Sequence, residues 1–262
     1  MANRNGLKGF FLFLIPIISL VAIWEAVYLM DIIKVLPSPA QASNRLVSLA
    51  MTQRDGIPLL LRHVGTSFYR ICLGFSLAML LGVPLGLLMG LNRYVNFLLK
   101  PLFSLVLPLP TLAWVPILLI VFGMGDITIV IAIFLGGFFS ITYNTATGVR
   151  GIDRDLIRAA NTMGASRLTM FTRILLPGSM VSVIAGLRLA VGYSWRALVG
   201  AEMLAAAGEG VGSFIFMARQ FSAVDDMFAG LVIIMLAGFV MERFLIEPLE
   251  KRTVRRWGMT RD

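Results

Sequence analysis

The chain has few of the side chains that build metal centres and covalent catalytic sites. Its 262 residues include a single cysteine, Cys72, and a single histidine, His63. One cysteine excludes a disulfide framework within the chain, and without a Cys or His cluster we expect no metal site. Cys72 lies in an apolar run, where we expect it to be a small buried residue. The same scarcity leaves little for a nucleophile or an acid–base pair, so we predict no catalytic residue.

Charge is also scarce. Charged residues make up 14% of the sequence and hydrophobic residues 58%, whereas a soluble domain carries far more charge. The net charge of +9 could indicate a nucleic-acid partner, but no basic stripe with interleaved aromatics appears. The lysines and arginines instead lie in short segments beside apolar blocks, which is typical of the cytoplasmic side of a membrane protein. We therefore expect a lipid bilayer around the chain and no nucleic acid.

The apolar residues form blocks long enough to cross a bilayer. The first block follows a basic start and resembles a signal peptide, but it is long enough to span and no small-x-small cleavage site follows it, so we expect a retained helix. The whole chain, 1–262, is predicted to be one all-α integral membrane domain. Its six predicted spanning helices cover residues 10–30, 61–90, 101–122, 127–149, 179–206 and 223–247.

Lysine and arginine counts predict the orientation of these helices. With the N-terminus inside, fifteen of these residues fall on the cytoplasmic side and five outside. Both termini are therefore predicted to be cytoplasmic. Residues 31–60 become an outside loop, in which we expect a short surface helix.

The third predicted helix contains Pro108, Pro110 and Pro116 around Trp114. Either these prolines bend a packed helix, or the helix is broken near the midplane and exposes backbone toward a pathway. Small residues in the other helices are expected to let helices approach closely; they are Gly82, Gly86, Gly90, Gly136, Gly137, Gly186 and Gly192.

A polar segment, residues 150–178, separates two of the most apolar blocks. Asp153 is a good N-cap for a short helix over 153–163, and Gly164 is placed to end it. Ser166 can cap a second helix, and Pro177 is expected to stop that helix before the next span. The apolar faces of the two helices are Leu156, Ala159, Ala160 and Met163 in the first and Leu168, Phe171, Ile174 and Leu175 in the second.

Two uses of this helix–glycine–helix segment are open on physical grounds. It can be a loop folded against its own helices at the membrane surface. It can also be a protruding knob that the groove of another protein grips.

The same segment carries a recognisable motif. Arg158-Ala159-Ala160, Gly164, Ile174 and Leu176-Pro177 resemble the "EAA" loop of ABC-importer permeases. The family motif begins with glutamate where this chain has Arg158, so a salt bridge from that glutamate is not expected here, although the packing of the small residues is. The resemblance implies a coupling helix that docks to an ATPase subunit, through Asp153, Arg158, Ala159, Ala160, Gly164, Ala165, Phe171, Ile174, Leu176 and Pro177.

The resemblance extends over nearly the whole chain. "PSPA" at 37–40, "FGMGD" at 122–126, "GLRLAVGYSWRALVGAEML" at 186–204 and "GEGVGSFI" at 208–215 are similar to permeases of the taurine, alkanesulfonate, nitrate and bicarbonate branch. This implies a type I ABC importer permease in a bacterial cytoplasmic membrane, which forms a homodimer with two ATPase subunits and an extracytoplasmic binding protein. The imported solute would be a small organic or inorganic anion, with a sulfonate such as taurine as the first candidate.

The chain itself is expected to bind no cofactor. It contains no G-x-x-x-x-G-K-[ST] motif, so ATP and magnesium are expected on the partner ATPase subunits, and this chain is not expected to be an enzyme. The "GEGVG" run at 208–212 lacks the phosphate-binding lysine and is predicted to be a glycine-rich turn.

Charged residues inside predicted spans are costly and often functional. Helical spacing places Arg188, Trp195, Arg196, Val199 and Glu202 near one line on the fifth helix. One hypothesis assigns this stripe to the translocation pathway, with an arginine tuned to an anion and Glu202 at the outer mouth. The alternative is that the charges, including Arg70 and Glu25, pair with one another or with backbone and pack the dimer.

Two other function classes are open. A secondary transporter driven by an ion gradient would favour paired acidic residues at midplane and inverted repeats, and neither is evident. A membrane enzyme would need a clustered nucleophile, metal set or acid–base pair.

Overall fold

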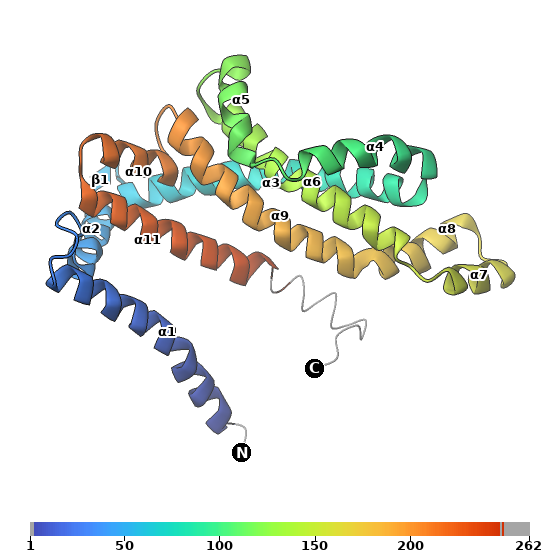
Figure 1. The fold of residues 1–262 in the computed structure, drawn as a ribbon, viewed down its shortest axis with the longest axis horizontal. Coiled ribbons are helices and arrows are strands. Elements are labelled where there is room, and N and C mark those ends of the chain that lie inside the picture. Colours follow the sequence, from blue (N-terminus) through green and yellow to red (C-terminus); the bar gives the residue numbers. More distant parts are fainter. Residues whose placement is uncertain (1–2, 247, 249–262) are drawn as a thin grey trace.

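The structure is a computed structural model that describes residues 3–246 and residue 248. It is almost entirely helical, and β1 (Gln53–Arg54) and β2 (Ile57–Pro58) form an antiparallel hairpin (Figure 1). The long helices are α1 (Asn3–Leu29), α3 (Leu59–Leu91), α6 (Asp126–Arg150), α9 (Leu176–Ala205) and α11 (Val224–Met241). The shorter ones are α2 (Pro39–Met51), α4 (Arg93–Val106), α5 (Val115–Phe122), α7 (Arg154–Thr162), α8 (Arg167–Met170) and α10 (Val211–Gln220), with a 3₁₀ turn η1 (Thr111–Trp114) and π-helical turns η2 (Phe171–Leu175) and η3 (Glu242–Ile246).

Within the described residues, four helical stretches are long and apolar enough to cross a membrane. The apolar part of α1, Leu14–Leu29, is shorter than these spans. The four confirm the predicted helices at 61–90, 127–149, 179–206 and 223–247, while the count of six spans and the cytoplasmic termini stay predictions. The four stretches are Leu59–Leu91, Asp126–Arg150, Arg167–Ala205 and Val224–Phe244.

The helix predicted at 101–122 is broken, which agrees with the second of the two alternatives for its prolines and rules out a single bent helix. α4 and the η1–α5 pair meet at an angle of 94°, and the break contains Pro108 and Pro110. Neither proline has an N–H to continue a helix, and each restricts the residue before it to extended backbone. α4 also starts earlier than predicted, since the side chain of Asn92 caps it by accepting from the Tyr94 N–H at 2.9 Å. If α4 and the η1–α5 pair are counted as one bent span, the number of candidate spans rises to five.

The core lies where α6 packs against α3 on one side and α9 on the other. Glycines spaced along α3 make this approach possible. A Cβ on Gly74 would lie 2.6 Å from the Ile133 Cβ of α6, and a Cβ on Gly90 would lie 2.5 Å from the Val149 Cβ. The predicted close-approach glycines are confirmed with one exception: a Cβ on Gly192 would meet nothing within 4 Å.

Cys72 is exposed, so the prediction that it is buried is wrong. Its neighbour Ile71, also on α3, is 2% exposed and packs in the hydrophobic core. One residue further along a helix turns the side chain by about 100°, which places Cys72 on the outer face.

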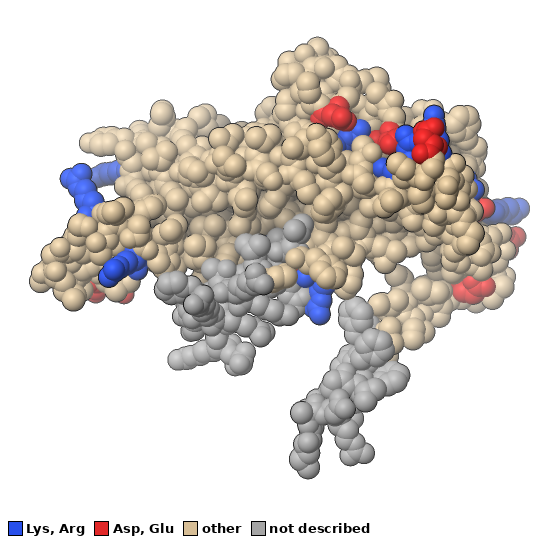
Figure 2. All heavy atoms as spheres, turned by 180° about the vertical axis from the view of Figure 1, so that it is seen from behind, with Lys and Arg blue, Asp and Glu red and all other residues tan. Residues whose placement is uncertain are grey.

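The molecule is elongated, with different elements at its two ends (Figure 1). α7 and α8 lie at one end of the long axis, and α2, β1 and α10 lie at the other. On the face seen in Figure 2, most charged side chains gather toward the two ends, and a broad uncharged band lies between them. This distribution fits a protein whose middle is surrounded by lipid.

Candidate functional site

The 150–178 segment forms the predicted helix–glycine–helix. The side chain of Asp153 caps α7 by accepting from the Asp155 N–H at 2.8 Å. Gly164 adopts a φ of +75°, a conformation that favours glycine. The turn is closed by a hydrogen bond from the Ala165 N–H to the Ala160 carbonyl at 3.0 Å. The predicted end of the first helix at Gly164 is therefore confirmed.

The second helix of the segment does not stop at Pro177, contrary to the prediction. Ser166 caps α8 as expected, accepting from the Thr169 N–H at 3.2 Å. The helix then widens through the π-helical turn η2, where the Leu176 N–H bonds to the Phe171 carbonyl. Pro177 follows directly after this turn, as the second residue of α9. The result is a continuous helical path from Arg167 to Ala205.

The segment presents apolar side chains outward. Met163 is 87% exposed, Leu168 72% and Leu156 52%, whereas Ala160 is buried. Arg158 forms a local ion pair with Asp155 at 3.1 Å, and both side chains are largely exposed. Phe171, Ile174, Leu176 and Pro177 are half-buried at the base of the segment. This arrangement favours the protruding knob over a loop folded against its own helices.

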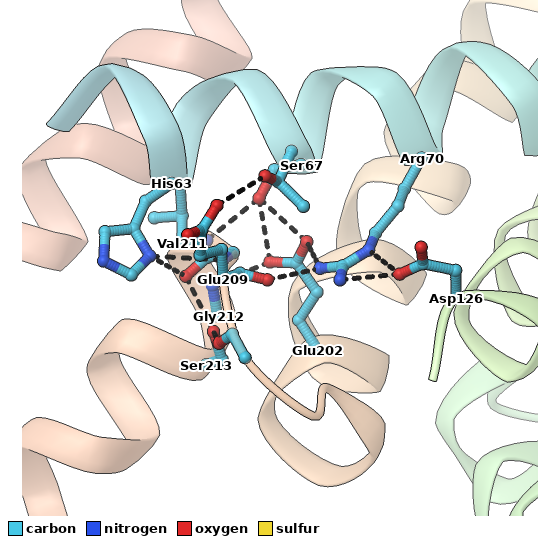
Figure 3. A network of polar contacts seen from close by, with 12 residues as sticks. His63, Ser67, Arg70, Asp126, Glu202, Glu209, Val211, Gly212 and Ser213 are labelled. Atoms are coloured by element: carbon cyan, nitrogen blue, oxygen red, sulfur yellow. Dashed lines mark hydrogen bonds and ion pairs between the residues drawn. The ribbon is translucent and has the colours of Figure 1, made fainter. Parts of the chain in front are cut away.

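A second polar site lies in the half of α9 far from this segment. The guanidinium of Arg70 is held from three sides, with each bond between 2.7 and 2.8 Å (Figure 3). Its partners are the carboxylates of Asp126 and Glu202 and the backbone carbonyl of Glu209. Glu202 also accepts from the Ser67 hydroxyl at 2.8 Å and from the Gly212 N–H at 2.9 Å. Arg70 and Glu202, whose side chains are 5% and 0% exposed, thus both have partners, as low-dielectric surroundings require, while the Asp126 side chain is 59% exposed.

The glycine-rich turn at 208–212 closes over this cluster (Figure 3). Gly210 has a φ of +144°, and a Cβ there would lie 2.7 Å from the Glu202 carboxyl carbon. The Val211 N–H donates to the Ser67 hydroxyl at 2.9 Å. The prediction of a turn is confirmed, and Gly210 and Gly212 are needed because the backbone passes directly against Glu202.

Asp126 reaches the cluster as the first residue of α6, directly after a glycine-containing turn. Gly123 and Gly125 in this turn both have positive φ. The Gly125 N–H donates to the Ala205 carbonyl at 2.8 Å, which joins the turn to the end of α9. Residues of the "FGMGD" stretch thus position a carboxylate at the start of α6.

The predicted pathway residues do not lie together. Arg188, Trp195 and Arg196 line a cavity of about 530 Å³, and Val199 and Glu202 are not among the residues that line it. The Glu202 side chain is fully buried against Arg70, and its place at an outer mouth stays a prediction. Arg188 pairs with Glu242 at 3.0 Å, and the suggested partner Glu25 makes no such bond in the described structure. Spacing along one helix could not reveal these partners, because they come from α3 and η3.

No group of three or more His, Cys, Asp or Glu side chains that could hold a metal ion occurs in the described part of the chain.

The sequence pattern of one protein family, described as "Binding-protein-dependent transport system inner membrane component", matches residues 82–254. The chain belongs to this family. It is therefore an ABC-importer permease and an integral multi-pass membrane protein. ABC-importer permeases form dimers and work with ATPase subunits and substrate-binding proteins. The family assignment gives no support to the secondary-transporter alternative.

Curated relatives agree with this assignment. The permease is 34% identical to the taurine transport system permease protein TauC of Escherichia coli over 225 residues, covering 85% of this chain and 82% of that protein. It is 32% identical to the bicarbonate transport system permease protein CmpB of Synechococcus elongatus over 248 residues, covering 92% and 89%.

A solved structure of the MetNI methionine ABC transporter in inward-facing conformations contains a chain of similar fold. The TM-score is 0.58 at 20% identity, covering 80% of this permease and 100% of that chain. The type I importer permease fold predicted from the sequence is thereby confirmed.

Proposed function

We propose that this permease moves a small oxyanion into the cytoplasm, with taurine or another sulfonate as the first candidate. The names of two relatives, for taurine and for bicarbonate, support the choice because both solutes carry an oxyanion group. The proposal places six spans in a bacterial cytoplasmic membrane with both termini inside. It includes a second copy of the chain, two ATPase subunits that bind ATP and magnesium, and an extracytoplasmic binding protein.

The observation that carries the proposal is the exposed segment at the start of α9. α8, η2 and α9 form one continuous helical path from Arg167 to Ala205. A displacement of the segment by a docked ATPase would therefore act on a helix that reaches the Arg70–Glu202 cluster at its other end. Met163, Leu168 and Leu156 supply the exposed apolar contacts for docking. The docking residues are those that the family resemblance implies, from Asp153 to Pro177.

The segment is anchored to the body of the permease at its base. Ile152 is 9% exposed, and a Cβ on Gly178 would lie 3.3 Å from its Cδ1 atom. The contact fixes the chain on both sides of the protruding helices. Force on α7 would thus pass to α6 and α9 rather than only moving a loose loop.

The test is a reconstituted complex. The permease is co-expressed with a candidate ATPase subunit and placed in proteoliposomes, and ATPase activity and uptake are measured with taurine-loaded binding protein. Gly164→Val should reduce stimulated ATPase activity and uptake at least tenfold, because a β-branched residue cannot keep φ at +75° without distorting the turn.

Gly56→Val is the matched control. Gly56 also has a positive φ, +77°, and a Cβ there would meet nothing within 4 Å, but it lies in the β1–β2 hairpin at the other end. Equal losses in the two variants, or normal uptake by Gly164→Val, would count against coupling through the segment. Uptake by the permease alone in ATP-free vesicles would contradict the importer function itself.

A further inference from the structure

A cavity of about 530 Å³ lies between α9 and the α11–η3 end of the chain. Its lining combines two arginines, two aromatic side chains and one carboxylate. From α9 come Arg188, Gly192, Tyr193, Trp195 and Arg196, and from the other side come Gly238 and Glu242. The buried Arg70–Glu202 cluster contributes no residue to it. Positive charge beside an apolar and aromatic wall is the composition of a site for a small organic anion.

Arg196 faces this cavity without an acidic partner among the described residues. Its guanidinium carbon lies 5.9 Å from the centroid of the Tyr193 ring, a distance at which a cation–π contact is favourable. A cation inside a spanning helix is costly unless it meets water or an opposite charge. The cavity supplies the space for either one next to Arg196.

Arg188, the second arginine, pairs with Glu242. The Nη2–Oε1 distance is 3.0 Å, and the two side chains are 53% and 62% exposed. An ion pair whose two side chains are this accessible is not a buried pair. An incoming anion can therefore replace the Glu242 carboxylate at Arg188 without first opening a buried pair.

Gly192 keeps the space between the arginines open. Arg188, Gly192 and Arg196 follow one another at intervals of four residues, so they lie on one face of α9, and the two arginine Cα atoms are separated by about 12 Å along the axis. A Cβ at Gly192 would meet nothing within 4 Å. Gly192 is thus not a close-packing glycine, and its missing side chain leaves a gap in the cavity lining between the two arginines.

We propose that this gap binds the oxyanion group of the imported solute, between Arg188 and Arg196 above Gly192, in exchange with the Glu242 carboxylate. The proposal rests on the proposed import function and adds a site within the permease itself. Guanidinium groups bind oxyanions by paired charge-assisted hydrogen bonds. When the solute leaves, Glu242 returns to Arg188 and balances the charge of that arginine again. Glu242 is therefore a competitor as well as a counter-ion.

The test measures binding directly in the full complex with its ATPase subunits, in lipid nanodiscs and without the binding protein. Radiolabelled ethanesulfonate is titrated at constant ionic strength with chloride. We expect saturable binding by the wild-type complex, weakened at least tenfold in Arg196→Gln and Arg188→Gln. Glu242→Gln should bind several-fold more tightly, because its competing carboxylate is gone. Gly192→Leu should lose binding because it fills the gap.

Gly65→Leu is the control for the glycine substitution. Gly65 also lies in a long helix with open space around a Cβ, so this variant should bind as the wild type does. Recovery of each assembled complex by size-exclusion chromatography is checked first, and Glu242→Gln provides a gain that misfolding cannot imitate.

The site is overturned if the wild-type complex shows no saturable ethanesulfonate binding, or if Arg196→Gln and Glu242→Gln bind with wild-type affinity. ATPase stimulation and uptake with taurine-loaded binding protein are measured on the same preparations. A wild-type complex that imports taurine but does not bind ethanesulfonate contradicts this site alone. A complex without ATP-driven import contradicts the proposed function.

Discussion

The guanidinium of Arg70 on α3 donates to the carboxylate of Glu202 on α9 at 2.8 Å, with side-chain exposures of 5% and 0%. The same arginine reaches Asp126 at the start of α6. One cluster, built on this buried pair, therefore connects the three helices that form the core. Because α9 also begins at the 150–178 segment, this cluster fixes the end of the helix opposite the proposed ATPase contact.

Breaking this pair should destabilise the permease strongly. Arg70→Met leaves the Glu202 carboxylate buried without its cation, and removing one partner of a buried pair costs about 3–5 kcal/mol. We expect a marked fall in the thermal unfolding midpoint of the purified complex. The double variant Arg70→Met with Glu202→Leu should be less destabilised than the sum of the single variants, because it removes both charges.

The exposed pair of Arg158 and Asp155 is the control for this experiment. Both side chains are more than 70% exposed, and surface pairs contribute about 0–1 kcal/mol. Asp155→Asn should therefore leave the unfolding midpoint nearly unchanged. A midpoint in Arg70→Met equal to that of Asp155→Asn would mean that the cluster has no structural role.

Gly210 should be intolerant of any side chain. Gly210→Ala would place a Cβ 2.7 Å from the Glu202 carboxyl carbon and 2.8 Å from the Arg70 Nη1 atom, at a φ of +144°. The turn must then lift off the ion pair, at a cost of about 2 kcal/mol or more in unfolding free energy. Gly208→Ala, in the same turn, meets nothing within 4 Å and should be nearly neutral. Equal thermal midpoints for the two variants would contradict this role of Gly210.

Features that depend on local sequence could be predicted. The ranges of α3, α6, α9 and α11 follow from apolar runs long enough to cross a bilayer. The α7 cap at Asp153 and the turn at Gly164 follow from side chains that act within a few residues of themselves. The family motif covered the same segment, so two independent lines of reasoning agreed there.

Features that depend on partners from other helices were missed or wrong. Arg70 and Glu202 are 132 residues apart, and a helical projection of one helix cannot show that they meet. The same projection grouped Glu202 with Arg188 and Arg196, although it is buried elsewhere. Pro177 gives a strong local stop signal, but the π-helical turn before it lets the helix continue, and only the backbone geometry reveals this.

The close packing of α3 on α6 gives a further prediction. A Cβ on Gly86 would lie 2.6 Å from the Thr142 backbone carbonyl oxygen, and a backbone atom cannot rotate away as a flexible side chain can. Gly86→Leu should therefore force the helices apart and reduce the yield of folded complex severely. Gly65→Leu, on the same helix but with open space, should be recovered at the wild-type yield. The measurement is monodisperse complex recovered per cell mass, and good recovery of Gly86→Leu would refute the packing argument.

The exposed tip of the 150–178 segment should lie against the ATPase subunit. A photoreactive amino acid in place of Met163, which is 87% exposed, should cross-link to that subunit on illumination of the assembled complex. Ile120 is also 87% exposed, and its helix α5 lies away from α7 and α8 (Figure 1), so the same probe there should give no such product. Cross-linked bands are identified by mass spectrometry of the permease–ATPase adduct. Strong ATPase adducts from position 120, or none from position 163 in a complex that hydrolyses ATP, would show that the motor subunit binds elsewhere on the permease.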